Sequence, residues 1–124
     1  MFENALDAIA ILDDGGHFVD ANPAALELFA VSRRDLLARR VHDFAVPEGR
    51  RALPGLWRRL LAEGSLEIEV EVARADGERR SVELAAKAGF LPGRHIAVIR
   101  DVTERKRLEG ELNRAQRLES LGRL

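Results

Sequence analysis

Cysteine is absent from the 124-residue sequence, and aromatic residues make up only 5% of it, with a single tryptophan. The absence of cysteine excludes disulfide bonds, thiolate metal sites and a cysteine nucleophile. No apolar run is long enough to span a membrane, and no signal peptide is recognisable. We therefore expect a cytoplasmic domain, while a membrane anchor elsewhere in a longer parent protein stays open.

The charge and histidine content point away from three further classes of function. The formal net charge is −1, and the paired arginines are offset by acidic residues, so we expect no nucleic-acid partner. The three histidines, His17, His42 and His95, are scattered without the spacing of a metal site. We expect no metal and no catalytic residue in this chain.

The order of predicted elements is two strands, several helices and three strands. Alternation, turn residues and helical spacing place strands at 8–12 and 17–21, helices at 24–29, 32–37 and 48–63, and strands at 67–72, 80–90 and 95–102. Leu36 and Leu37 are expected to face inward, and Pro54 is expected either to start the regular part of the long helix or to kink it. The chain thus divides into the end of an entering helix at 1–7, a domain at 8–102 and a terminal helix at 103–124.

The last predicted strand differs from its neighbours because residues 96–99 are all apolar. Such a run indicates that both faces of the strand are covered. We expect the core to cover one face and the entering helix or a second chain to cover the other.

The junction between the last strand and the terminal helix contains no linker. Asp101 at the N-cap and Glu104 at the third helical position fit a capping box, with Thr103 as an alternative cap. A strand that passes directly into a helix is a stiff joint, so we predict that a shift of the strand tilts or rotates the helix.

The terminal helix carries an apolar stripe together with two glycines. Its stripe consists of Leu108, Leu112, Ala115, Leu118 and Leu121. The spacings between the first apolar residues of the stripe are those of a heptad repeat, and the later spacings depart from it. Gly110 and Gly122 each cost about 1 kcal/mol in a helix interior, so a partner helix is needed. We predict a parallel homodimer through this helix, with the outer sheet face contributing; the alternative is a helix folded back on its own domain.

Several of these segments resemble one family of sensor domains. Residues 101–106, DVTERK, resemble the D-I/V-T-E-R-K signature that closes PAS domains, and residues 22–25, NPAA, resemble a motif near their start. Residues 29–37 resemble a family motif, and the family has glycines at the position of Ala30 and, directly after this stretch, at the position of Ala38. Residues 115–124 resemble the linker that enters the dimerisation helices of bacterial sensor histidine kinases. The resemblance implies an α+β PAS fold, with a five-stranded antiparallel sheet, helices on one face and a C-terminal coiled-coil helix.

The resemblance also implies a pocket between the inner sheet face and the helices. The candidate lining residues are Leu26, Phe29, Leu37, Leu53, Trp57, Val70, Leu84 and Val98. The same residues would simply fill the core if no ligand were bound. We expect no haem, because residues 48–63 contain no histidine, and no covalent flavin adduct, because cysteine is absent. An unknown small molecule stays possible, and the purified protein is expected to be colourless.

The sequence therefore predicts a sensory and dimerisation module of a two-component histidine kinase whose kinase core lies outside this chain. His42 begins a His-Asp-Phe phrase that also occurs in phosphoacceptor boxes, but it lies between two predicted helices, so we interpret it as a structural polar contact. Two alternatives stay open: a purely structural dimerisation domain, or the regulatory PAS domain of another enzyme such as a diguanylate cyclase.

Overall fold

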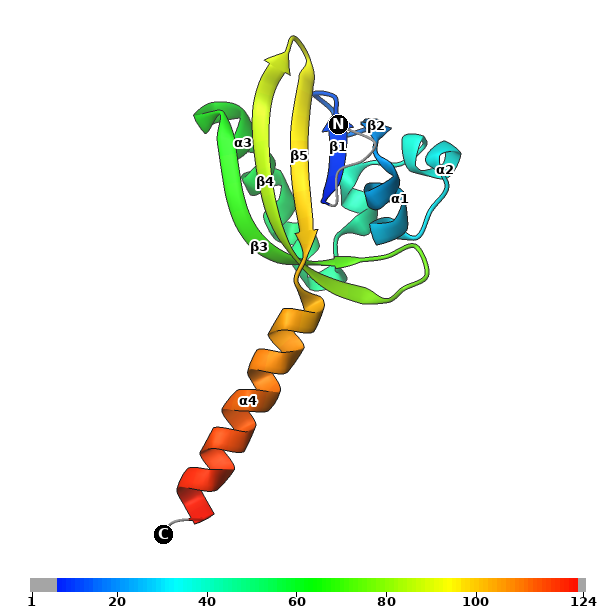
Figure 1. The fold of residues 1–124 in the computed structure, drawn as a ribbon. Coiled ribbons are helices and arrows are strands. Elements are labelled where there is room, and N and C mark those ends of the chain that lie inside the picture. Colours follow the sequence, from blue (N-terminus) through cyan, green and yellow to red (C-terminus); the bar gives the residue numbers. More distant parts are fainter. Residues whose placement is uncertain (1–6, 123–124) are drawn as a thin grey trace.

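The computed structural model describes residues 7–122, with side chains described through residue 117. The predicted end of an entering helix therefore lies, up to residue 6, outside the described residues. The elements in chain order (Figure 1) are β1 (Ala8–Leu12), β2 (Phe18–Ala21), α1 (Pro23–Phe29), α2 (Arg33–Leu37), the 3-10 helices η1 (Val41–Phe44) and η2 (Pro47–Ala52), α3 (Leu53–Glu63), β3 (Ser65–Ala73), β4 (Arg79–Leu91), β5 (Arg94–Asp101) and α4 (Thr103–Gly122).

The strands form one antiparallel sheet in the order β2-β1-β5-β4-β3. The two sequence-distant halves meet at its centre, where β1 pairs with β5 from Ala8 opposite Ile99 to Leu12 opposite His95. The helices α1, α2 and α3 cover one face of the sheet, and α4 projects away from the domain beyond the end of β5 (Figure 1). This confirms the predicted sheet, the one-sided helix layer and the presence of the terminal helix.

Short polar side chains begin the first two helices. Asn22 caps α1 by accepting a hydrogen bond from the Ala25 N–H, and its carboxamide also accepts from the Ile9 N–H of β1. Ser32 caps α2 by accepting from the Asp35 N–H. Because a cap satisfies backbone donors that the helix itself leaves unpaired, these two residues fix where each helix starts.

The predicted helix at 48–63 is two elements rather than one. Pro54 has no N–H and cannot bond to the Arg50 carbonyl at the spacing of an α-helix. That carbonyl instead accepts from the Leu53 N–H, at the tighter spacing of the 3-10 helix η2. Regular α3 then starts at Leu53, with Pro54 in its first turn, and ends at Glu63, where Gly64 forms the C-cap with φ 84°.

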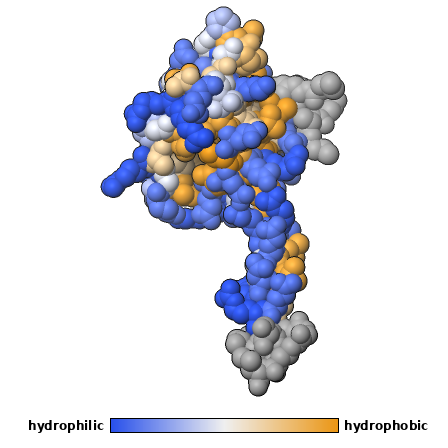
Figure 2. Space-filling model, turned by 90° about the vertical axis from the view of Figure 1, so that its left-hand side faces the viewer, coloured by the Kyte–Doolittle hydropathy of each residue, from blue (hydrophilic) through white to orange (hydrophobic). Residues whose placement is uncertain are grey.

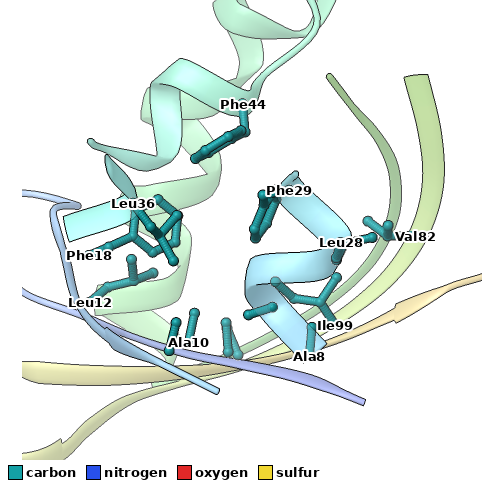
Figure 3. Close-up of a cluster of buried hydrophobic side chains, with 14 of the residues drawn as sticks. Ala8, Ala10, Leu12, Phe18, Leu28, Phe29, Leu36, Phe44, Val82 and Ile99 are labelled. Carbon is teal, nitrogen blue, oxygen red and sulfur yellow. The ribbon is translucent and has the colours of Figure 1, made fainter. Parts of the chain in front are cut away.

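The core lies between the inner sheet face and the helices (Figure 3). Phe18, Phe29 and Phe44 converge there from β2, α1 and η1, with ring centroids 4.4 to 5.9 Å apart. Leu36 is fully buried, whereas Leu37 is 40% exposed. The expectation that both leucines face inward was thus wrong for Leu37, because the five-residue helix α2 presents only one side to the core.

The apolar run in β5 alternates between the two sheet faces. Ala97 and Ile99 are buried in the core, while Val98 between them is 37% exposed on the opposite face. The predicted cover of this outer face, the entering helix or a second chain, lies outside the described residues up to residue 6 and beyond a single chain, so it stays a prediction. None of the helices in this part of the chain is both long and apolar enough to cross a membrane.

Candidate sensory cavity and signalling junction

A small apolar cavity of about 100 Å³ lies inside the core, between the sheet and η1, η2 and α3. Four of the predicted pocket residues line it, namely Phe29, Leu53, Val70 and Leu84. Its volume is well below the roughly 300–1,000 Å³ of sites for drug-sized ligands. The cavity therefore suits a small apolar molecule of a few heavy atoms.

The other four predicted pocket residues lie elsewhere. Leu26 packs against the outside of the core, and Leu37 and Val98 are exposed. Trp57 lines a second cavity beside the turn between β1 and β2. Val98 is excluded from the inner cavity by strand parity, since its neighbours Ala97 and Ile99 occupy the inner face.

Sequence reasoning missed several residues that line the inner cavity. Ile68 lies two residues before Val70 on the same face of β3, and Leu56 lies three residues after Leu53 in α3. Both spacings were visible in the sequence as alternation and helical periodicity. Phe44 and Val46 also line the cavity, but they come from a segment without periodicity that gave no such signal.

The turn between β1 and β2 is tied to α3 and to β5 through Asp14. The Trp57 Nε1–H donates to the Asp14 carbonyl oxygen at 3.2 Å, and the Asp14 carboxylate lies 2.8 Å from Nε2 of His95. The rings of Trp57 and His95 meet edge to face, with centroids 5.7 Å apart. These contacts hold three segments that are distant in sequence at one end of the sheet.

The junction between β5 and α4 is anchored to β4 at Ser81. The Ser81 carbonyl accepts from the Val102 N–H at 2.8 Å, and the Ser81 N–H donates to the Thr103 hydroxyl oxygen at 2.8 Å. The Thr103 side chain thereby extends the strand ladder by one bond beyond the last paired residue of β5. Val102 is buried, so the connection is packed as well as hydrogen-bonded.

The predicted capping box at the start of α4 takes another form. The Asp101 carboxylate accepts from the Thr103 N–H at 2.9 Å, two residues along. Glu104 forms an ion pair with Arg107 on the helix itself. Asp101 also lies 3.6 Å from Arg80 of β4, which further fixes the strand end.

The first turn of α4 is held against glutamates on the outer face of the sheet. Arg105 bonds to Glu83 of β4 at 2.8 Å, and Lys106 forms an ion pair with Glu69 of β3. The hydrogen bond from Lys106 lowers the pKa of Glu69, and the bond to Glu83 raises the pKa of Arg105. The first turn of α4 is therefore attached to one cross-strand pair of glutamates, Glu69 and Glu83.

Beyond that turn, α4 exposes part of its apolar stripe. Leu108 is 53% exposed and Leu112 is 57% exposed, and Ala115 is also exposed. Figure 2 shows an apolar patch on this otherwise hydrophilic helix, to which the exposed leucines contribute. The side chains of Leu118 and Leu121 lie outside the described residues.

A family model described as "PAS fold" matches residues 2–107. The chain belongs to the PAS family. As a PAS domain it is a sensory module, and the inner cavity occupies the place between sheet and helices that the resemblance implied.

Relatives of this PAS domain include kinases. It is 31% identical over 116 residues to sporulation kinase E of Bacillus subtilis, a match that covers 94% of the chain but only 16% of that kinase. A domain of a sensory box sensor histidine kinase/response regulator from Geobacter sulfurreducens is 31% identical, with a TM-score of 0.65, over 81% of this chain and 87% of that one. A PAS domain from Colwellia psychrerythraea shares the fold, with a TM-score of 0.75 at 19% identity, over 83% and 92% of the two chains.

No group of three or more metal-ligating side chains occurs in the part of this PAS domain that the structure describes. His17 contacts Asp13, and His95 is held by Asp14 and Gly89. His42 lies at the rim of the second cavity, in η1, where it has an exposed side chain.

Proposed function

We propose that this PAS domain is the sensory and dimerisation module of a histidine kinase and controls a kinase core that follows α4 in the parent protein. The relation to sporulation kinase E and to the Geobacter sensor histidine kinase domain supports the choice of output. A kinase core uses ATP, so the proposal places the domain on the cytoplasmic side of any membrane.

The observation that carries the proposal is the anchored junction between β5 and α4. Ser81 of β4 bonds to both Val102 and Thr103, and Lys106 bonds to Glu69 of β3. A displacement of β4 relative to β5 therefore changes the direction of α4 instead of being absorbed in a flexible link. In known proteins, shifts of packed helices by roughly 1–2 Å are a common way to switch between two conformational states.

The inner cavity supplies one place where a signal could act. Leu84 of β4 and Ile99 of β5 both line it, and both strands lead to the junction. A small apolar molecule in this cavity would press on the two strands that hold α4. The kind of molecule follows from the cavity size and its apolar wall.

Dimerisation is the second part of the proposal. A two-fold kinase core receives one helix from each subunit, so the two copies of α4 would enter it side by side. The exposed Leu108 and Leu112 supply an apolar seam for that pairing. Val98 and the neighbouring apolar residues on the outer sheet face would contribute a further contact.

Insertions in α4 test this mechanism. Residues 1–124 would be fused to the kinase core of a sensor histidine kinase, and one to seven residues would be inserted after Glu111. Each added residue rotates the following helix by about 100°. We expect autophosphorylation to rise and fall with a period of about 3.5 residues.

The matched control places the same insertions after Gly77, in the turn between β3 and β4, where they do not alter the length of α4. These variants should keep the activity of the parent fusion. A steady decline of activity with insertion length in α4, or no change at all, would show that the helix does not transmit rotation.

A further inference from the structure

A second cavity, of about 340 Å³, lies between the β1–β2 turn, η1 and the start of α3. It is at the end of the sheet opposite α4, where Leu12 of β1 pairs with His95 of β5. The inner apolar cavity shares only Val41 and Leu53 with it, so these two side chains form the wall between the cavities. Its volume lies at the lower end of the range for sites that bind small molecules.

The rim of this outer cavity carries basic side chains. Arg40, His42 and Arg58 line it. The Arg40 guanidinium is fixed by two hydrogen bonds, from Nε and Nη2, to the Gly15 carbonyl oxygen. Because a guanidinium carries five N–H groups, others stay available for a ligand.

The nearby acidic side chains are engaged with other groups. The Asp14 carboxylate bonds to His95, and the Asp43 carboxylate accepts from the Arg40 backbone N–H. The Asp13 carboxylate accepts from two backbone N–H groups of its own turn. Among the side chains that the structure describes, no carboxylate forms an ion pair with Arg40, His42 or Arg58 within 4.0 Å. The guanidinium groups of Arg40 and Arg58 are therefore not held in ion pairs by the protein.

The floor of the same cavity is apolar. Val41, Leu53, Pro54 and the ring of Trp57 form it. The Trp57 ring is held in place by its hydrogen bond to the Asp14 carbonyl. An apolar floor beneath a basic rim suits a molecule with an apolar body and one anionic head.

We propose that the outer cavity is a binding site for small organic carboxylates with a short apolar body. The carboxylate lies between Arg40 and Arg58, and the apolar body covers Trp57 and Leu53. The guanidinium geometry favours a carboxylate, because its N–H groups can donate in parallel to two oxygens. This binding requires neither the kinase output nor an occupant of the inner cavity, so it stands apart from the function proposed above.

Trp57 makes the test direct, because it is the only tryptophan in the chain and it lines the proposed site. The full chain would be titrated at low ionic strength with hexanoate while Trp57 emission is recorded. Acetate supplies the charge without the apolar body, and 1-hexanol supplies the apolar body without the charge. We expect saturable binding of hexanoate, and at least tenfold weaker binding of acetate and of 1-hexanol.

Two variants on adjacent positions of α3 separate the site from general electrostatics. Arg58→Gln should weaken hexanoate binding about tenfold, which matches the loss of one charge-assisted contact. Arg59→Gln removes a charge from the next position, which pairs with Glu63 outside the cavity, and should leave the affinity within about twofold of the wild type. Arg40→Gln is a second test, with circular dichroism showing whether the turn at Gly15 has kept its structure.

Three outcomes would overturn the proposal. The first is the lack of saturable hexanoate binding. The second is binding of 1-hexanol as tight as that of hexanoate, which would place the ligand in an apolar cavity without charge recognition. The third is an equal loss of affinity in Arg58→Gln and Arg59→Gln. None of these results would bear on rotation of α4, so the two proposals fail separately.

Discussion

Nε2 of His95 lies 2.8 Å from Oδ1 of Asp14, so a buried side chain of β5 is tied to the turn between β1 and β2. On its other side the imidazole accepts, at Nδ1, a hydrogen bond from the Gly89 N–H at 2.9 Å. The proton of the neutral ring therefore lies on Nε2 and points to Asp14. One histidine thus joins the β4–β5 hairpin to the first hairpin of the domain.

Replacing His95 by leucine should destabilise the domain more than removing its partner. His95→Leu removes both hydrogen bonds of a buried imidazole, to Gly89 and to Asp14, at a cost of about 1–3 kcal/mol in the free energy of unfolding. Asp14→Ala should cost less than about 1 kcal/mol, because the Asp14 side chain is 76% exposed and water can replace it. Urea unfolding followed by circular dichroism measures both. Equal losses would show that the carboxylate, rather than the Gly89 bond, supports the hairpin.

Ala30 adopts the left-handed conformation, with φ 58°, directly after α1. An alanine there carries about 1–2 kcal/mol of strain that glycine would avoid. Ala38, at the end of α2, has an ordinary φ of −90°. Ala30→Gly should therefore leave the stability equal or higher, while Ala38→Gly should lower it by about 0.4–1 kcal/mol through the unfolded chain. Thermal unfolding compares the two, and the same loss in both variants would contradict strain at Ala30.

Local patterns predicted the elements of the sheet because each depends on short-range chemistry. The strict alternation at 67–72 identified β3, and the residues Asp13 to Gly16 identified the first turn. The resemblance at 101–106 then supplied the topology, since no local pattern states that β1 pairs with β5.

The candidate site was harder to predict, for two physical reasons. Four successive apolar residues in β5 conceal strand parity, so the sequence could not show that Val98 faces away from the core and Ala97 toward it. Leu36 and Leu37 are chemically identical neighbours, and only the docking of α2 decides which is buried. The outer cavity brings together Gly15, Arg40 and Arg58, which come from three separate segments of the chain and share no sequence motif.

Thr103 offers a sharper test of the junction than the charged residues around it. Thr103→Val keeps the shape of the side chain but leaves the Ser81 N–H without its acceptor at 2.8 Å. We expect a loss of about 1–3 kcal/mol in stability and faster amide exchange at Ser81. Thr103→Ser keeps the hydroxyl and should retain both the protection and most of the stability. Unchanged exchange at Ser81 in the valine variant would show that the hydroxyl does not extend the sheet.

Acid should weaken the attachment of α4 to the sheet. The pKa of Glu69 lies below its usual value of 4.5, because Lys106 donates a hydrogen bond to it and Arg105 adds a second positive charge. A carboxyl whose pKa is lowered in the folded state stabilises that state above its unfolded pKa. This contribution is therefore present at neutral pH and is lost as the pH falls below about 4.5 and through the lowered pKa.

Titration of the Glu69 carboxyl by nuclear magnetic resonance checks this prediction. In Lys106→Gln the pKa of Glu69 should move up toward its usual value. Lys87→Gln, which removes a lysine of β4 that forms no ion pair among the described side chains, should leave the pKa of Glu69 where it is. An unshifted pKa in Lys106→Gln would contradict the role of this ion pair.

The seam on α4 should hold two copies of the chain together. Leu108 and Leu112 lie one turn apart on the same side of the helix, and each is more than half exposed in the single chain. Burial of one leucine contributes about 1.5–3 kcal/mol, which is a large share of the binding free energy of a small interface. We expect the wild type to sediment as a dimer at tens of micromolar, and Leu112→Asp to associate at least tenfold more weakly. Leu61→Asp, at an exposed leucine of α3, should leave association unchanged.

A substitution at Gly110 of the same helix should have the opposite effect and strengthen the dimer. Apart from the neighbouring backbone of α4 itself, a methyl group at this position would meet nothing within 4 Å, so alanine fits without rearrangement of its surroundings. Gly110→Ala should stabilise α4 by about 1 kcal/mol and tighten the dimer, because less of the pairing energy is then spent on ordering the helix. Sedimentation over a range of concentrations measures the dimer dissociation constants of Leu112→Asp and Gly110→Ala against that of the wild type. A dimer that is equally stable in Leu112→Asp and Gly110→Ala would show that the two chains meet through the outer sheet face rather than through α4.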